Sequence, residues 1–146
     1  MLCLCDIYDL LDPIEEDRSV HVVKNKQLRF EWPSLMVFQN DLCRELTPEW
    51  IDSPTSAPQS FNWASTYGVG ELPSELNHCV GYDLPRTDAK IVHFTQGIPC
   101  FEETKDSEYG PQWLDEFNSA RSSVSWTEIM GNSVHAKPVL ERMARG

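Results

Sequence analysis

The stretch K-I-V-H-F-T-Q-G-I-P-C-F, residues 90–101, decides which fold the chain is expected to adopt. Its first half carries the β-branched and aromatic residues that are typical of a buried strand. Gly97 and Pro99 follow, and both residue types end strands and form turns. His93 is therefore expected at or near the end of a strand, ahead of a loop whose glycine lets backbone N–H groups approach a ligand. This order predicts a site for a metal ion and a phosphate.

Two further segments flank this stretch. An L-P-x-x-x-N segment lies before it at residues 72–77, and an E-Y-x-x-x-W segment lies after it at residues 108–113. The three segments in this order resemble the C-terminal half of a GT-A-type glycosyltransferase related to glycosyltransferase family 8. The resemblance implies an α/β fold: the C-terminal part of a GT-A-like mixed sheet with flanking short helices, several of them after Glu108.

The start of the chain is a second point of resemblance. Residues 1–12, M-L-C-L-C-D-I-Y-D-L-L-D, are similar to the part of these enzymes that follows the D-x-D motif. The chain is therefore expected to begin just after that motif. Residues 1–146 would form a single partial domain without the N-terminal nucleotide-binding half, and the sequence has no Gly-rich strand-to-helix turn that could bind the nucleotide.

Composition limits the classes of partner. The chain has 146 residues, enough for one domain, and its formal net charge of −11 disfavours binding to nucleic acid or to an anionic membrane. Five cysteines, an odd number without C-x-x-C spacing, do not suggest a secreted disulfide framework. The N-terminus resembles neither a signal peptide nor a membrane span. A cytoplasmic protein is expected.

The resemblance also implies roles for particular residues. His93 would be the protein's ligand to a manganese or magnesium ion that bridges the donor's diphosphate, once the D-x-D half is present. Gly97 would let backbone amides approach the phosphate. The family motif has the form H-x-x-G-x-x-K-P-W, whereas this chain has one extra residue before the glycine and no lysine before Pro99. Lys105 is the nearest substitute for that lysine.

Four more residues are candidates for the sugar and acceptor sites. Ser34 matches a small polar residue that faces the sugar pocket in the family, and Asn77 ends the L-P-x-x-x-N segment. Asn62 stands about where family members carry an aspartate on the acceptor side, which makes it the catalytic candidate. Trp63 beside it could stack on a sugar ring. A second interpretation of the aromatic pair, Phe61 and Trp63, is that both rings anchor the loop to the core.

His93 and the polar residues near the N-terminus each admit two interpretations. His93 could be a structural histidine that hydrogen-bonds a neighbouring loop. Asp6, Asp9 and Asp12 recur every three residues and could hold a cation, although a solvated helix face is the simpler interpretation. The Cys3 and Cys5 pair could join histidines in a zinc site, but the spacing is not the one that structural zinc prefers.

Local patterns predict the remaining elements. Strands are expected at residues 20–23, 34–38 and 78–82, and the strand at 34–38 is apolar enough to be central in its sheet. Residues 24–26 are expected to form a polar turn. The helices are expected at residues 41–46, from 47 with Thr47 as N-cap, from 107 or 108 to 120, and at 126–130 with a Ser125–Glu128 capping box.

The function that follows is transfer of a sugar from a nucleotide-diphosphate donor to an unknown acceptor, a hexosyltransferase-like activity. By itself the chain is expected to be truncated or inactive, and a partner chain would supply the missing N-terminal half. The alternative is a non-catalytic carbohydrate-binding or interaction module that keeps the sheet and the aromatic loop without the chemistry.

Overall fold

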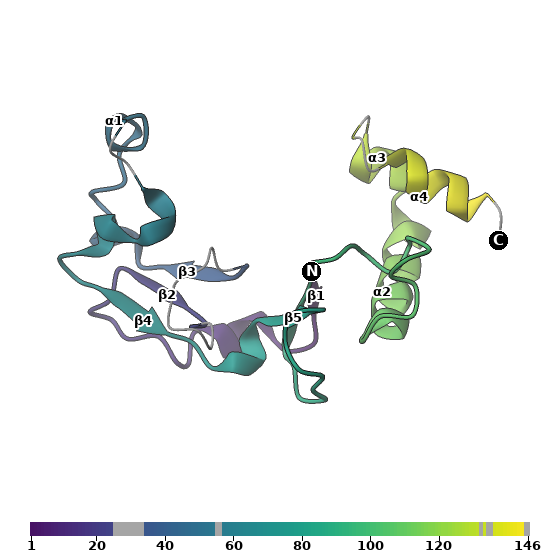
Figure 1. Cartoon of the computed structure of the whole chain (residues 1–146), viewed down its shortest axis with the longest axis horizontal. Coiled ribbons are helices and arrows are strands. Elements are labelled where there is room, and N and C mark those ends of the chain that lie inside the picture. The colour runs from purple at the N-terminus through teal and green to yellow at the C-terminus, as the bar shows by residue number, and fades with distance from the viewer. Residues whose placement is uncertain (25–33, 55–56, 132, 134–135, 145–146) are drawn as a thin grey trace. The chain divides into compact units, whose positions relative to one another are not determined.

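The chain has a mixed α/β fold with two small three-stranded sheets and short helices (Figure 1). A computed structural model describes residues 1–24, 34–54, 57–131, 133 and 136–144. The strands are β1 (Leu2–Cys3), β2 (Val20–Val22), β3 (Met36–Phe38), β4 (Val69–Glu71), β5 (His78–Val80) and β6 (Ile91–Phe94). The α-helices are α1 (Pro48–Ile51), α2 (Gly110–Ser123), α3 (Trp126–Met130) and α4 (Ala136–Met143). The described residues also form five 3₁₀ helices: η1 (Ile7–Leu10), η2 (Asn40–Leu42), η3 (Pro58–Ser60), η4 (Asn62–Ala64) and η5 (Ser74–Leu76).

One sheet has the order β3-β2-β4 (Figure 1). Strand β2 pairs antiparallel with β3 and parallel with β4, and all three of its residues are buried. The predicted strand at residues 20–23 is thus confirmed. The strand predicted at residues 34–38 is shorter than expected, and its expected central position is wrong. Strand β3 lies at the sheet edge, where Phe38 is 41% exposed.

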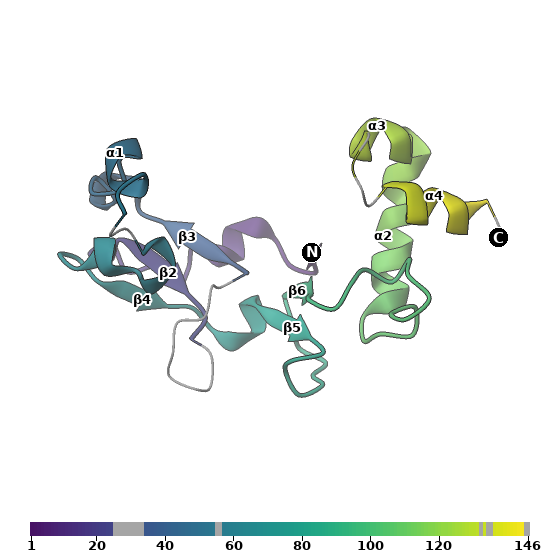
Figure 2. The same ribbon diagram turned by 45° about the horizontal axis from the view of Figure 1, so that its top comes forward.

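The other sheet has the order β1-β6-β5. Strands β5 and β6 are labelled in Figure 2. Strand β6 coincides with the apolar run that begins after Lys90, and Ile91, Val92 and Phe94 are all buried. The middle strand of a sheet is shielded by both neighbours, which suits this run of β-branched and aromatic side chains. The prediction of a buried strand that carries His93 is confirmed.

The chain divides into two compact units, which we describe separately. The first unit comprises Met1–Leu2, Cys79–Arg86 and Phe94–Gly146, and the second comprises Cys3–His78 and Thr87–His93. The expected single partial domain over residues 1–146 stays a prediction. The boundary falls between His93 and Phe94, so the strand with the metal-ligand candidate ends where the first unit resumes.

Among the described residues of the second unit, buried side chains form two clusters. One surrounds strand β2 and includes Trp63 and Ala64, while the other includes Leu72 and Ile91. Burial of such side chains contributes about 1.5–3 kcal/mol each, an upper estimate because the unfolded chain is itself partly compact.

Helix α2 organises the described part of the first unit. Trp113 and Phe117 lie one turn apart on its buried face, and their rings stack with centroids 5.1 Å apart. The Trp113 ring also meets Phe94 edge-on at 6.4 Å. The predicted core stripe is confirmed at these two positions, while Leu114 beside them is half-buried. The helix begins at Gly110, later than predicted, because Tyr109 adopts a left-handed conformation and donates its hydroxyl to the Arg86 carbonyl.

Local capping rules describe the short helices well. Thr47 accepts a hydrogen bond from the Trp50 N–H, and Ser125 forms the predicted capping box with Glu128. The helix predicted at residues 41–46 is instead the shorter η2, which starts after Gln39 and has no side-chain cap. The turn predicted at residues 24–26 falls mainly outside the described residues.

Strand β4 was not predicted, because a glycine at its centre lowers the strand signal. That glycine, Gly70, lies opposite His21 in the parallel register. A Cβ added at Gly70 would lie 2.5 Å from the His21 Nε2 atom. His21 is fully buried, so its ring has little room to move away.

We predict that Gly70→Ala destabilises the protein by about 1–3 kcal/mol, the usual cost of overpacking a buried site. Urea unfolding of the single variants and of the double variant His21→Ala/Gly70→Ala measures this cost. The added methyl should cost clearly less when the imidazole is absent. An equal cost in both backgrounds would show that the ring contact is not the cause.

Candidate functional site

His93 is the penultimate residue of strand β6 and is half-buried. Its Nδ1 atom is buried and has no hydrogen-bond partner. Burial lowers the pKa of the imidazole below its ordinary value of 6.5. The ring is therefore neutral at pH 7, which is the form of histidine that binds metal ions.

Gly97 has a backbone φ of +123°, a conformation that residues with a side chain rarely adopt. A Cβ there would also lie 3.2 Å from the Phe101 ring. The glycine is thus required by the loop, as the sequence predicts. The loop is closed by its own bonds, since the Thr104 hydroxyl donates to the Ile98 carbonyl at 2.6 Å. Contact of its amides with a phosphate stays a prediction.

Lys105 has an ionic partner within the same loop region. Its Nζ atom lies 2.6 Å from the Glu102 Oε1 atom. Both side chains are largely exposed, so the pair adds little stability. The paired carboxylate offsets the charge that would otherwise be free for a phosphate, so the structure adds no support to Lys105 as a substitute for the family lysine.

Trp63 is a core residue and is only 4% exposed. Its Nε1 atom donates to the Pro58 carbonyl at 3.2 Å, and its ring stacks on Phe38 with centroids 6.1 Å apart. The ring therefore anchors the loop to the core, and it offers almost no surface to a sugar in this conformation. Asn62, the residue before it, is exposed at the start of η4.

Ser34 and Asn77 come from different parts of the second unit. Ser34 is half-buried just before β3, and Asn77 is buried between η5 and β5. The strand that carries His93 contributes Ile91 to one core cluster, whereas Trp63 belongs to the other. The predicted residues of this unit are thus spread over several elements.

The three aspartates near the N-terminus have separate roles. Asp6 caps η1 by accepting a hydrogen bond from the Tyr8 N–H at 3.0 Å. Asp9 and Asp12 line an open cavity of about 290 Å³ together with Glu75 and Lys90. Within the described part of the chain, no three His, Cys, Asp or Glu side chains converge as a metal site. A metal-ligand role for His93 stays a prediction.

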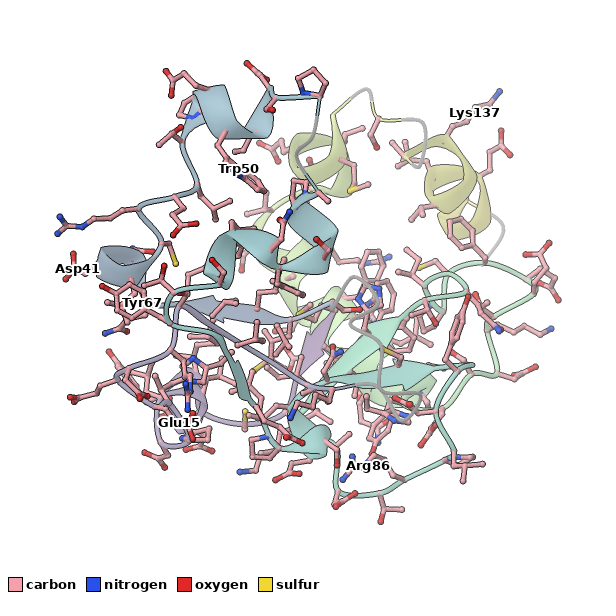
Figure 3. All side chains as sticks on the ribbon, turned by 60° about the vertical axis from the view of Figure 1, so that its left-hand side comes forward. Glu15, Asp41, Trp50, Tyr67, Arg86 and Lys137 are labelled. Carbon is pink, nitrogen blue, oxygen red and sulfur yellow. The ribbon has the colours of Figure 1, made fainter. Side chains whose placement is uncertain are left out.

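A larger open cavity of about 540 Å³ was not predicted. Asp41 and Tyr67 lie on its walls and are labelled in Figure 3. The Thr66 hydroxyl donates to a Glu45 carboxylate oxygen at 3.0 Å on the same wall. The sequence signal would have been the exposed Thr-Tyr pair before a glycine, which is too common to mark a site alone.

His21 is a structural histidine that the sequence did not reveal. Its Nε2 atom accepts a hydrogen bond from the Glu15 N–H at 2.9 Å. Burial lowers its pKa, so it too is neutral at pH 7. This bond holds the ring against the backbone through Nε2, while its buried Nδ1 atom, like that of His93, has no hydrogen-bond partner.

Comparison with known proteins finds a distant relative. Protein CDI of Arabidopsis thaliana is 27% identical over 139 residues, a match that covers 79% of this chain and 54% of Protein CDI. This chain thus spans about half the length of that relative. No protein-family model and no solved structure matches the chain. No helix in the described segments combines the length and hydropathy needed to cross a membrane.

We predict that the His93 imidazole titrates below pH 6.5, because burial disfavours its charged form. Below about pH 6.5 the unfolded chain therefore binds more protons than the folded one. The free energy of unfolding should then decrease as the pH falls, because protonation favours the unfolded chain. NMR titration of the imidazole signals gives the midpoint, and urea unfolding from pH 5 to 8 gives the stability. His93→Gln should flatten part of this dependence. A midpoint at or above 6.5 would contradict the prediction.

Proposed function

We propose that this chain is part of a GT-A-type glycosyltransferase related to family 8, which moves a sugar from a nucleotide-diphosphate donor to an acceptor. The observation that carries the proposal is the state of His93: a neutral, half-buried imidazole at a strand end, with a buried nitrogen that makes no hydrogen bond. The order of the three sequence segments around β6 supports it. The mixed α/β fold is compatible with this assignment.

His93 would hold a manganese or magnesium ion as one ligand among several. When bound, such an ion acts as a Lewis acid and offsets the charge that develops on the departing diphosphate. Hard cations of this kind prefer oxygen ligands and need several of them. The described residues bring no three such ligands together. The carboxylates would come from the D-x-D motif that the resemblance implies, which the sequence of this chain does not contain and which a partner chain would supply.

The other predicted site residues differ in their exposure and backbone conformation, and so in how they fit the proposal. Asn62 is exposed and could face an acceptor, and the Gly97 bend could bring backbone amides toward a phosphate. Ser34 and Asn77 keep the substrate-binding roles that the resemblance implies. Trp63 does not enter the proposal, because its ring is covered by the core.

A second candidate function is a non-catalytic interaction module. Three apolar side chains of one short segment favour it: Ile7 is 59% exposed, Tyr8 72% and Leu11 57%. All three belong to η1 or directly follow it, and a contiguous exposed apolar patch marks an interaction surface. The same surface is also compatible with the glycosyltransferase proposal. A partner segment that completes the domain would bind to exposed apolar side chains of this kind.

We predict that manganese together with uridine diphosphate binds next to His93. Mn²⁺ is paramagnetic, so it should broaden the His93 imidazole signals more than those of the buried His21 and His78. Mg²⁺ with the same nucleotide should leave the line widths unchanged. NMR spectra of the histidine side chains detect even the weak binding expected from a single protein ligand.

Calorimetry on matched variants separates the two candidates. His93→Phe should abolish the heat of manganese–nucleotide binding, while Asn62→Ala should retain it, since Asn62 belongs to the acceptor side. Absence of selective broadening at His93 in the wild-type chain, with no measurable heat in any variant, would favour the interaction module instead.

A further inference from the structure

Two thiols lie side by side where strand β1 ends. Cys3 is exposed, Cys5 is half-buried, and both are free. Their sulfur atoms are 4.0 Å apart, and the Cys3 thiol points to the Cys5 carbonyl at 3.4 Å. Cys3 is the last residue of β1, and Cys5 lies in a bend two residues further along the chain.

The separation of the sulfurs indicates what they can bind. A disulfide bond is only about 2.05 Å long, so direct oxidation would require the pair to move together by roughly half the present distance. Two thiolates on one metal ion lie apart by up to two metal–sulfur bonds, roughly 4.6 Å at about 2.3 Å each. The observed 4.0 Å is close to this second value.

The surroundings narrow the choice of metal. Zinc prefers four ligands, and no third His, Cys, Asp or Glu joins the pair among the residues that the structure describes. Cys5 also packs against an apolar cluster that includes Leu10 and Ile91, which disfavours a hard, hydrated cation. Soft thiolate ligands select copper in its monovalent state.

We propose that Cys3 and Cys5 form a binding site for one copper(I) ion, held by the two thiolates. Burial and the adjacent Cys3 raise the pKa of the Cys5 thiol, so the metal binds by displacing protons. The reaction converts Cu⁺ and two thiols into a bis-thiolate complex of charge −1 and releases two protons. No electron is transferred.

The other thiols provide an internal comparison. The Cys43 thiol donates to the Ser19 carbonyl at 3.0 Å and to the Gln39 carbonyl at 3.2 Å, so it already serves the fold. Cys79 is half-buried on β5 and provides the matched control for accessibility.

Anaerobic titration with copper(I), in competition with a chromogenic copper(I) chelator, tests the site on the whole chain. We expect one ion per chain. Cys3→Ser and Cys5→Ser should each weaken binding by roughly 100-fold or more, because a single thiolate loses the chelate advantage. Cys79→Ser should bind as the wild type does. X-ray absorption should show two sulfur neighbours around the copper.

Protection from alkylation gives a second readout that does not depend on the variants. Bound copper(I) should shield Cys3 and Cys5, but not Cys79, from iodoacetamide in the wild-type chain, as peptide mass spectrometry will show. Failure of the wild type to hold copper(I) against the chelator would overturn the proposal. Unchanged binding in folded Cys3→Ser and Cys5→Ser variants would do the same.

Discussion

The arrangement of the second unit depends on the close approach of strands β2 and β4, which is possible because Gly70 leaves room for the His21 ring. The ring fixes two segments at once, since its Nε2 atom accepts a hydrogen bond from the Glu15 backbone. The ladder continues past the strand, where the Leu72 N–H donates to the Val22 carbonyl at 2.9 Å. These contacts position η5, and the Glu75 carbonyl in turn accepts from the Lys90 N–H at the entry to β6. The contacts around the His21 imidazole are thus linked through the backbone to strand β6, which carries His93.

His21 and His93 are both histidines with a lowered pKa, but His21 has a role in the fold, whereas His93 is proposed to bind a ligand. Both have a pKa lowered by burial and are neutral at pH 7. His21 uses a ring nitrogen in the fold, and this use offsets part of the cost of burying a polar ring. The Nδ1 atoms of both rings are buried without a hydrogen-bond partner, and that of His93 lies near the end of strand β6. An unsatisfied buried nitrogen costs about 1–3 kcal/mol, so a ligand that uses it would recover part of that cost.

Prediction from sequence succeeded where the cause is local and failed where tertiary packing decides. The buried strand at β6, the Thr47 cap and the Ser125 capping box depend on residues next to one another, and all are confirmed. Strand β4, by contrast, is stabilised by pairing with β2 despite its central glycine, which no local pattern reveals. The same limit holds for the candidate site. The position of His93 near the end of a strand was predicted, and the structure adds that its buried Nδ1 atom has no hydrogen-bond partner. Trp63 could not be placed from sequence, because an aromatic ring beside an amide suits a core and a sugar site equally.

Abundant carboxylates do not make a site for a hard cation, and this chain illustrates the reason. It has 23 acidic residues, yet many act singly: Asp6 caps a helix, Glu15 pairs with Arg18, and Glu71 pairs with Lys24. A carboxylate that satisfies a local donor is not directed at a common centre, and mutual repulsion opposes bringing several together without the ion. Manganese bound through His93 would therefore need oxygen ligands that are held in place by other chain segments. The proposed copper(I) site at Cys3 and Cys5 would need no such ligands, because a soft monovalent ion can be held by two sulfurs, and these two already lie 4.0 Å apart.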